Sequence, residues 1–193
     1  MNKALFLDRD GVVNIDTVHP YRIEDFEFTP GIFDLCREFR DMGFLIIIIT
    51  NQAGIAKGLY STRDFNILTD WMTDEFRKND IIISKVYFCP HHPEKGFAGE
   101  RAELKVECEC RKPAPGMILK AAKDLNLDLS RSWMIGDSTA DLACARAAKV
   151  KAVLVRTGNG GMDGKFPVQA DHTFDSLPHA TRFIVSHPLP ITT

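Results

Sequence analysis

The sequence lacks an apolar run long enough to cross a membrane. Its longest run, from Phe44 to Ile49, spans six residues, whereas a transmembrane helix needs about 20. A basic excess is also missing, because 24 Lys and Arg face 26 Asp and Glu and the formal net charge is −2. General nucleic-acid and membrane-surface binders usually carry such an excess. We therefore expect neither partner, and local positive groups would have to bind any anionic ligand.

The start of the sequence shows no secretory signal. Residues 1–4 lead directly into a short apolar run, without a long signal core or a small-residue cleavage site. We therefore expect a cytoplasmic protein. Five cysteines, an odd number, then indicate metal binding or buried thiols and not a disulfide framework. The 193 residues suffice for one domain, residues 1–193, with a core of its own, and we expect a monomer.

Short apolar runs alternate with amphipathic helical patterns along the chain. Five runs are predicted as strands: 4–7, 44–49, 85–88, 133–135 and 152–155. Helices are predicted over 31–42, from a capping box at Ser61 and Asp64 onward, over 115–125 and over 139–148. This alternation predicts an α/β fold in which a doubly wound, mostly parallel, Rossmann-like sheet has helices on both faces.

Polar side chains follow three of the predicted strands. Asp8 and Asp10 come after the first strand, Thr50 and Asn51 after the second, and Asp137 after the fourth. In doubly wound sheets, ligands bind beyond the carboxyl ends of the strands. The sequence therefore predicts that these groups meet at one edge of the sheet and form a site there.

The aspartates of these segments suit phosphoryl transfer. Asp8 and Asp10, two residues apart, can divide nucleophilic attack and proton transfer between them, although a D-x-D-G segment is also typical of a solvated turn. Asp137 and Asp141 offer oxygen ligands for Mg²⁺. The alternative is that Asp137 or Ser138 caps the following helix and that Asp141 is exposed on its first turn.

Two further segments carry groups that suit a phosphate. The segment Thr50-Asn51-Gln52 places hydroxyl and amide groups at the end of the most apolar strand, where they could bind a phosphate oxygen or serve as a turn or cap. Arg111 and Lys112 precede the third predicted helix. Lys is a compact charge that can neutralise a transferring phosphoryl group, and Arg is a planar fork suited to recognition, although such basic pairs are usually solvated.

Together these segments resemble the haloacid dehalogenase superfamily of phosphohydrolases. The match is D-R-D-G-V at Asp8, T-N-Q at Thr50, R-K-P at Arg111 and G-D-S-x-x-D around Asp137. The resemblance implies the Rossmann-like fold of the haloacid dehalogenase superfamily, without a large cap domain. It also implies that Asp8 is the nucleophile and that Asp10 acts first as general acid and then as general base. It also implies that Thr50 and Lys112 stabilise the phosphoryl group. The implied Mg²⁺ ligands are Asp8, the Asp10 carbonyl and Asp137, with Asp141 in support.

A second cluster suits a structural metal. Cys89 and His91 are followed, after 16 intervening residues, by Cys108 and Cys110. Three thiolates and one imidazole form a closed tetrahedral set typical of structural Zn²⁺, which would order the polar loop of residues 89–110. His92 is the neighbouring candidate, and His91 is preferred because C-x-H is similar to the pattern of related phosphatases. The alternative is a set of scattered core cysteines.

Within the superfamily, C-x-H and C-x-C before R-K-P resemble phosphatases of heptose bisphosphates. This resemblance implies a sugar bisphosphate, a small phosphorylated metabolite, as substrate. It implies a substrate site formed by Asp16, Thr17, Val18, His19, Thr50, Asn51, Gln52, Ala53, Arg111 and Lys112. Ser138 departs from members that carry Lys there. Histidinol-phosphate phosphatases share the catalytic and zinc pattern and remain an alternative, as does a non-catalytic, zinc-stabilised phosphate-binding module.

Overall fold

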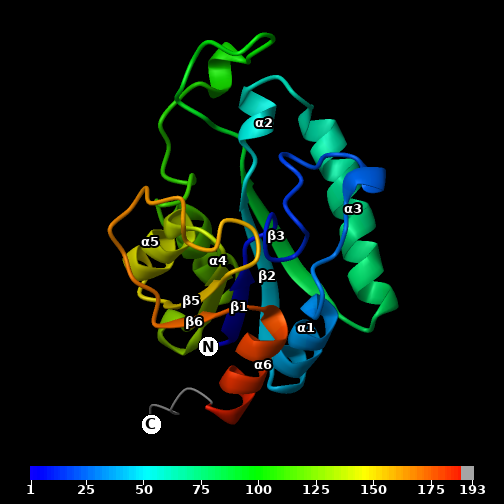
Figure 1. The fold of residues 1–193 in the computed structure, drawn as a ribbon, viewed down its shortest axis with the longest axis vertical. Helices are drawn as coiled ribbons and strands as arrows, with labels where there is room; N and C mark the ends of the chain where they lie inside the picture. Colours follow the sequence, from blue (N-terminus) through cyan, green and yellow to red (C-terminus); the bar gives the residue numbers. More distant parts are fainter. Residues whose placement is uncertain (188–193) are drawn as a thin grey trace.

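The computed structural model describes residues 1–187 and contains one parallel sheet (Figure 1). Its six strands lie in the order β3-β2-β1-β4-β5-β6, and every neighbouring pair is parallel. They are β1 (Lys3–Leu7), β2 (Phe44–Asn51), β3 (Ile83–Cys89), β4 (Trp133–Gly136), β5 (Lys151–Val155) and β6 (His172–Phe174). The five predicted strands are confirmed. The sixth was missed because its three residues are too few to show a period.

The connections between the strands are mostly helical. The helices are α1 (Ile32–Asp41), α2 (Ala53–Ala56), α3 (Thr62–Lys78), α4 (Gly116–Leu125), α5 (Thr139–Ala147) and α6 (Leu177–Ser186). Short 3₁₀ turns lie at Ile23–Asp25, Ala102–Leu104 and Leu129–Arg131. The four predicted helices are confirmed, whereas α2 and α6 were not anticipated. No helix within residues 1–187 combines the length and apolarity that a membrane crossing requires.

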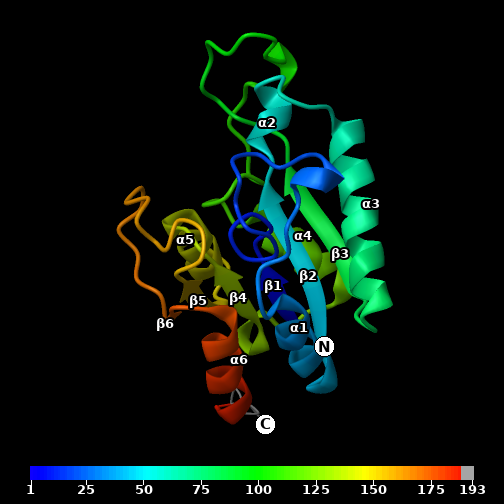
Figure 2. The same cartoon turned by 45° about the vertical axis from the view of Figure 1, so that its right-hand side comes forward.

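The alternation of side chains along the strands divides the core into two layers, one on each face of the sheet. Helices lie on both sides of the sheet (Figure 2). Leu5 and Ile48 point to the face covered by α1, α3 and α6, whereas Phe6 and Ile47 point to the face covered by α4 and α5. Both faces of the central strands are fully buried, which explains why β2 reads as a continuous apolar run. The doubly wound prediction is therefore confirmed.

Strand β2 continues two residues beyond its predicted end. Thr50 and Asn51 belong to the strand and lie opposite Phe88 and Cys89 of β3. The polar end of β2 therefore adjoins the first cysteine of the predicted zinc cluster. This register brings two motifs that are distant in the sequence to the same edge of the sheet.

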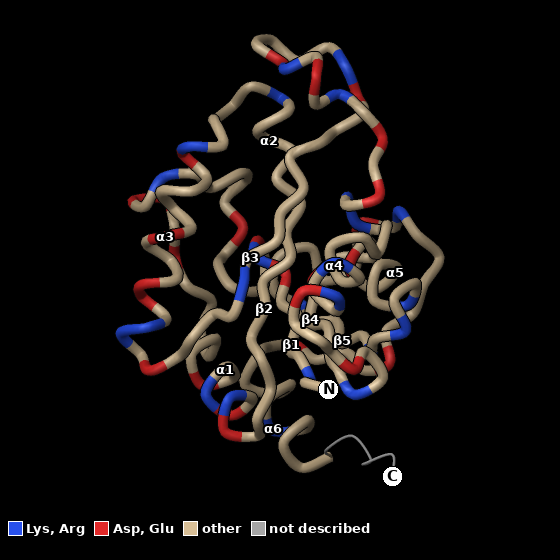
Figure 3. Tube along the Cα trace, turned by 180° about the vertical axis from the view of Figure 1, so that it is seen from behind, with Lys and Arg blue, Asp and Glu red and all other residues tan. Residues whose placement is uncertain are grey.

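The loop of residues 90–107 extends beyond that edge and packs over α2 (Figure 1). The backbone N–H of Arg101 donates to the carbonyl of Ala56 at 2.9 Å, and Leu104 packs against Ile55 and Tyr60. Acidic and basic residues alternate along this loop, seen at the top of Figure 3. The loop forms one wall above the carboxyl ends of the strands.

We predict that the capping box of α3 contributes measurably to stability. The Ser61 hydroxyl accepts from the Asp64 N–H at 3.1 Å, and the Asp64 carboxylate accepts from the Ser61 N–H at 2.8 Å. Ser61→Ala should lower the free energy of unfolding by about 1 kcal/mol in urea titrations. Arg63→Ala, an exposed change in the same turn, is the control. Equal stability of the two variants would show that the cap contributes nothing.

Candidate active site

Asp8 lies directly after β1, and its carboxylate is held in place from two sides. The Arg9 N–H donates to its Oδ1 at 2.7 Å, and the Lys112 ammonium lies 2.8 Å from the same oxygen. The side chain is 13% exposed, and it lines a cavity in the described part of the chain. A carboxylate that is oriented, paired and accessible from one side is suited to nucleophilic attack.

Lys112 is buried among carboxylates. Its ammonium lies 2.6 Å from Asp141 and donates to the carbonyl of Ile49 at 3.2 Å. Burial alone would lower the pKa of Lys112, but the carboxylates of Asp141 and Asp8 raise it above its ordinary value. The lysine is therefore charged. Asn51 fixes its backbone, donating to the Lys112 carbonyl at 3.1 Å and accepting from its N–H at 3.0 Å.

Asp8, Asp137 and Asp141 place carboxylate oxygens within 4.8 Å of one another. Burial, and then the charge of Asp141, raises the pKa of Asp137 to about 6. The same two causes raise the pKa of Asp8 well above its ordinary range. One lysine is too little positive charge for three clustered carboxylates. An all-oxygen donor set that lacks positive charge fits a hard cation such as Mg²⁺.

Asp141 is occupied on both of its oxygens. One meets Lys112, and the other accepts from the N–H and hydroxyl of Ser138, at 3.1 and 2.6 Å. The Ser138 hydroxyl in turn accepts from the Asp141 N–H, which completes the capping box of α5. The predicted cap at Ser138 is thus present, but Asp141 is fully buried instead of exposed. It holds the Lys112 ammonium beside Asp8.

The loop after β5 orients Asp137, and the sequence analysis did not anticipate it. The backbone and side-chain N–H groups of Asn159 donate to Asp137 Oδ2 at 2.6 and 3.0 Å. Gly11 and Gly158, both with positive φ, pack so closely that a Cβ atom on either would collide with that oxygen. The glycine-rich segment 158–161 was the only available signal, and glycine alone indicates no more than a turn.

Asp10 is held by a buried network. The guanidinium of Arg9 donates to its two oxygens at 3.0 and 3.1 Å, and Gln52 donates to Oδ2 at 3.1 Å. The Gln52 amide also donates to the Thr50 hydroxyl at 2.8 Å and accepts from the Tyr60 hydroxyl at 2.6 Å. Arg9 and Tyr60 were missed by the sequence analysis. Their positions fix the Asp10 carboxylate at the end of β1, close to Asp8 in the sequence.

A cavity of about 780 Å³ opens above these groups. Of the predicted site residues, it is lined by Asp8, Asp10, Asp16, His19, Thr50, Asn51, Ala53, Cys108, Arg111, Lys112 and Asp137. Thr17 and Val18 line a smaller, adjoining pocket instead. Gln52 lies behind the cavity wall, where it contacts Asp10. The cavity is large enough for a metabolite of sugar-phosphate size.

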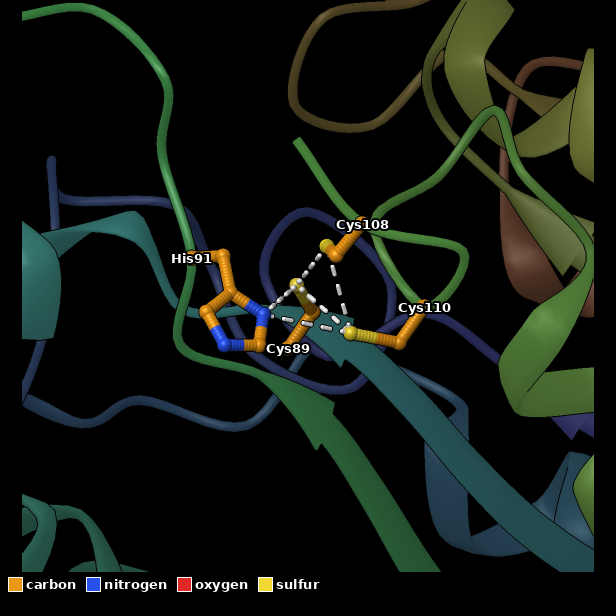
Figure 4. Close-up of side chains that lie close together, drawn as sticks. All are labelled: Cys89, His91, Cys108 and Cys110. Atoms are coloured by element: carbon orange, nitrogen blue, oxygen red, sulfur yellow. Dashed lines mark hydrogen bonds between the residues drawn. The ribbon is translucent and has the colours of Figure 1, made fainter. Parts of the chain in front are cut away.

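Cys89, His91, Cys108 and Cys110 converge on one point (Figure 4). The Cys110 sulfur lies 3.2 Å from that of Cys89 and 3.3 Å from that of Cys108, and His91 Nδ1 lies 3.4 Å from it. Four soft ligands this close suit a tetrahedral metal with bonds of about 2.0–2.3 Å. Cys36 and Cys144 are instead buried in the core, on opposite faces of the sheet.

The neighbouring histidine faces the other way. His92 lines the cavity instead of the cysteine cluster. Burial lowers the pKa of His92, and the charges of Arg111 and Lys57 lower it further. Arg111 also donates to the carbonyl of His91 at 3.2 Å. The cysteine cluster and the cavity therefore share a wall.

Comparisons with known proteins agree with this geometry. A family model described as HAD-hydrolase-like matches residues 109–180. D-glycero-beta-D-manno-heptose-1,7-bisphosphate 7-phosphatase of Yersinia pestis is 46% identical over 156 residues, covering 80% of this chain and 81% of the relative. The Haemophilus influenzae protein of the same name is 42% identical over 185 residues, covering 95% of this chain and 97% of the relative.

The fold agrees as well. A crystal structure of D,D-heptose 1,7-bisphosphate phosphatase from B. bronchiseptica, complexed with magnesium and phosphate, superposes with a TM-score of 0.79 at 29% identity. The match covers 95% of this chain and 98% of that one. The chain therefore belongs to the D-glycero-beta-D-manno-heptose-1,7-bisphosphate 7-phosphatase family of HAD-like hydrolases.

Proposed function

We propose that the protein removes the 7-phosphate of D-glycero-D-manno-heptose 1,7-bisphosphate through a phospho-aspartate formed on Asp8. The observation that carries this proposal is the Asp8 carboxylate, paired with Lys112 and grouped with Asp137 at the base of a substrate-sized cavity. The names of the relatives support the choice of substrate. A protein that only bound phosphate would not need clustered carboxylates there, because they repel an anion unless a cation intervenes.

Asp8 and Asp10 perform different steps of the reaction. An Asp8 oxygen attacks phosphorus, and the bond from phosphorus to the sugar oxygen breaks while Asp10 donates a proton to that oxygen. Water then attacks the phospho-aspartate, Asp10 accepts the proton, and phosphate leaves with Asp8 restored. Lys112 and Thr50 stabilise the negative charge of the transferring group.

Two metals complete the proposal. Asp8, Asp137 and the backbone carbonyl of Asp10 would hold Mg²⁺, which supplies positive charge to the phosphoryl oxygens and keeps the carboxylates ionised. Cys89, His91, Cys108 and Cys110 would hold Zn²⁺. With four protein ligands and no open position, that zinc is structural.

The substrate assignment is tested by steady-state kinetics with Mg²⁺. We expect kcat/KM for heptose 1,7-bisphosphate to exceed that for histidinol phosphate, whose cationic amine meets Arg111 and Lys57 on the cavity wall. A preference for histidinol phosphate would reject the heptose assignment while leaving the phosphatase chemistry intact. Release of no phosphate from either compound would reject both.

We predict that Asp8→Asn reduces turnover to background with the fold retained, because an amide is a poor nucleophile and does not accept the phosphoryl group. Phosphate release and circular dichroism on the same sample check this. Asp34→Asn, a change of the same type on the surface of α1, is the control and should keep full turnover. Appreciable activity of Asp8→Asn would exclude Asp8 as the nucleophile.

Asp10→Asn should lower kcat for the sugar phosphate by about 10²- to 10⁴-fold, because proton transfer to the leaving oxygen is lost. An activated aryl phosphate needs little protonation of its leaving group, so its cleavage should suffer less. The measurement is the ratio of the two kcat losses. Equal losses for both substrates would show that Asp10 acts in some other way.

Cys110→Ala should lose zinc and turnover together. Arg111 and Lys112 follow Cys110 directly, so releasing its sulfur frees the backbone that aims both cations, and a displacement near 1 Å can cost about 10²-fold. Zinc content, melting temperature and turnover are measured on one sample, and added Mg²⁺ should not restore activity. Cys36→Ala, on the buried face of α1, is the control that should keep its zinc. If the Cys110→Ala variant lacks zinc but keeps normal turnover, the cysteine cluster does not position the catalytic groups.

A further inference from the structure

The side chain of Gln52 lies at the centre of a buried hydrogen-bond network. Its Nε2 donates to the Asp10 carboxylate at 3.1 Å and to the Thr50 hydroxyl at 2.8 Å. Its Oε1 accepts from the Tyr60 hydroxyl at 2.6 Å. Gln52 is 1% exposed and Tyr60 is 5% exposed. Because solvent barely reaches the amide, its direction depends on these contacts with protein groups.

The chemistry of the partners allows one direction of the Gln52 amide. An ionised carboxylate only accepts hydrogen bonds, so the amide nitrogen has to face Asp10. A reversed amide would place its oxygen against the carboxylate and leave two buried acceptors without a donor. With the nitrogen toward Asp10, the amide oxygen faces Tyr60, and the phenol has to donate. Burial raises the pKa of Tyr60, so the phenol keeps the proton that it donates.

The same direction of the amide has a consequence for Thr50. A hydroxyl group has one hydrogen to donate and two lone pairs that accept. Thr50 accepts from Gln52, so its own hydrogen points elsewhere. Thr50 lines the cavity, whereas Gln52 lies behind the cavity wall. The hydroxyl hydrogen is therefore free to meet a phosphoryl oxygen, as a donor that is oriented before negative charge develops.

The Tyr60 ring is itself held in a fixed position. It stacks on Tyr21, with ring centroids 5.2 Å apart and planes 10° apart, and it packs in a small apolar cluster with Phe65. Gly54 allows this approach, because a Cβ atom there would collide with the ring. A rigid aromatic side chain therefore presents the hydroxyl to Gln52.

We propose that Tyr60 is a positioning residue, which acts on Asp10 and Thr50 through the amide that it orients. This inference rests on the proposed function, because the roles of those two groups come from it. Within residues 1–187, Tyr60 lies outside the cavity lining, so it acts through Gln52 and not on the substrate. Its hydroxyl keeps an N–H directed at Asp10 and leaves the Thr50 hydrogen for the transferring phosphoryl group.

The test begins with Tyr60→Phe, which removes the donor and keeps the ring that stacks on Tyr21. We expect kcat for heptose 1,7-bisphosphate to fall about 3- to 10-fold, the size of one neutral hydrogen bond, with KM unchanged. An activated aryl phosphate, whose leaving group needs little protonation, should lose less. Circular dichroism and melting temperature on the same samples check that the fold is retained.

A double-mutant cycle with Gln52→Met tests whether the effect passes through the amide. Adding Tyr60→Phe to Gln52→Met should cause no further loss of kcat, because the hydroxyl then has no amide to orient. Two independent structural effects would instead multiply. The comparison of the two substrates for Tyr60→Phe alone does not depend on the Gln52→Met variant.

Tyr87→Phe is the matched control. It also removes a phenol hydroxyl, which donates to Asp124 at 2.9 Å, and in the described part of the chain both residues lie outside the cavity lining. It should keep wild-type kcat on both substrates. Multiplied losses in the double variant, or equal losses of Tyr60→Phe on the two substrates, would overturn the assignment of Tyr60 and leave the proposed function standing. If the wild-type enzyme releases no phosphate from either substrate, the proposed function fails first and the assignment of Tyr60 falls with it.

Discussion

The pairing of the buried Lys112 ammonium with Asp8 and Asp141 is the interaction on which the site depends. A lysine taken out of water costs several kcal/mol unless opposite charges compensate it. The two carboxylates, at 2.8 and 2.6 Å, provide that compensation. The carboxylates depend equally on the lysine, because they lie close enough to repel each other. Asn51 sets the position of the lysine through its backbone. The carboxyl ends of β1, β2 and β4 are thereby joined through one ammonium group.

The same geometry explains which parts of the site could be predicted from the sequence. Asp8, Thr50 and Asp137 each follow or end a strand of strong apolar character, and parallel strands bring their carboxyl ends to one edge. Arg9 and Asn159 could not be found in this way. Arg9 lies between two aspartates, where a solvated turn residue would look the same, and its burial depends on Pro20 and Phe65. Such contacts join residues that are distant in the sequence, so the spacing of apolar residues within one segment does not predict them.

The helices show the same limit. The sequence predicted the capping box of α3, formed by Ser61 and Asp64, and the apolar face of α1. Each of these is a local pattern of neighbouring residues. Helix α2, with four residues, is shorter than one reliable period, and its burial comes from the loop packed over it. Local patterns therefore predicted α1, α3, α4 and α5, and α2 was missed because a neighbouring loop provides its burial. Helix α6 was missed although it carries its own buried face at Leu177, Ala180 and Ile184.

The cysteine cluster links the fold of the chain to the candidate active site. Its four residues come from the end of β3, the loop that follows it and the segment just before α4, so the cluster brings the strand edge and the R-K-P segment together. Arg111 then reaches back to the carbonyl of His91, on the far side of the loop that packs over α2 and Lys57. A shift of this cluster would therefore move the loop and the R-K-P segment together, and with them Lys112 relative to Asp8. The loop that appears in the sequence as a polar insertion thus belongs to the wall of the cavity.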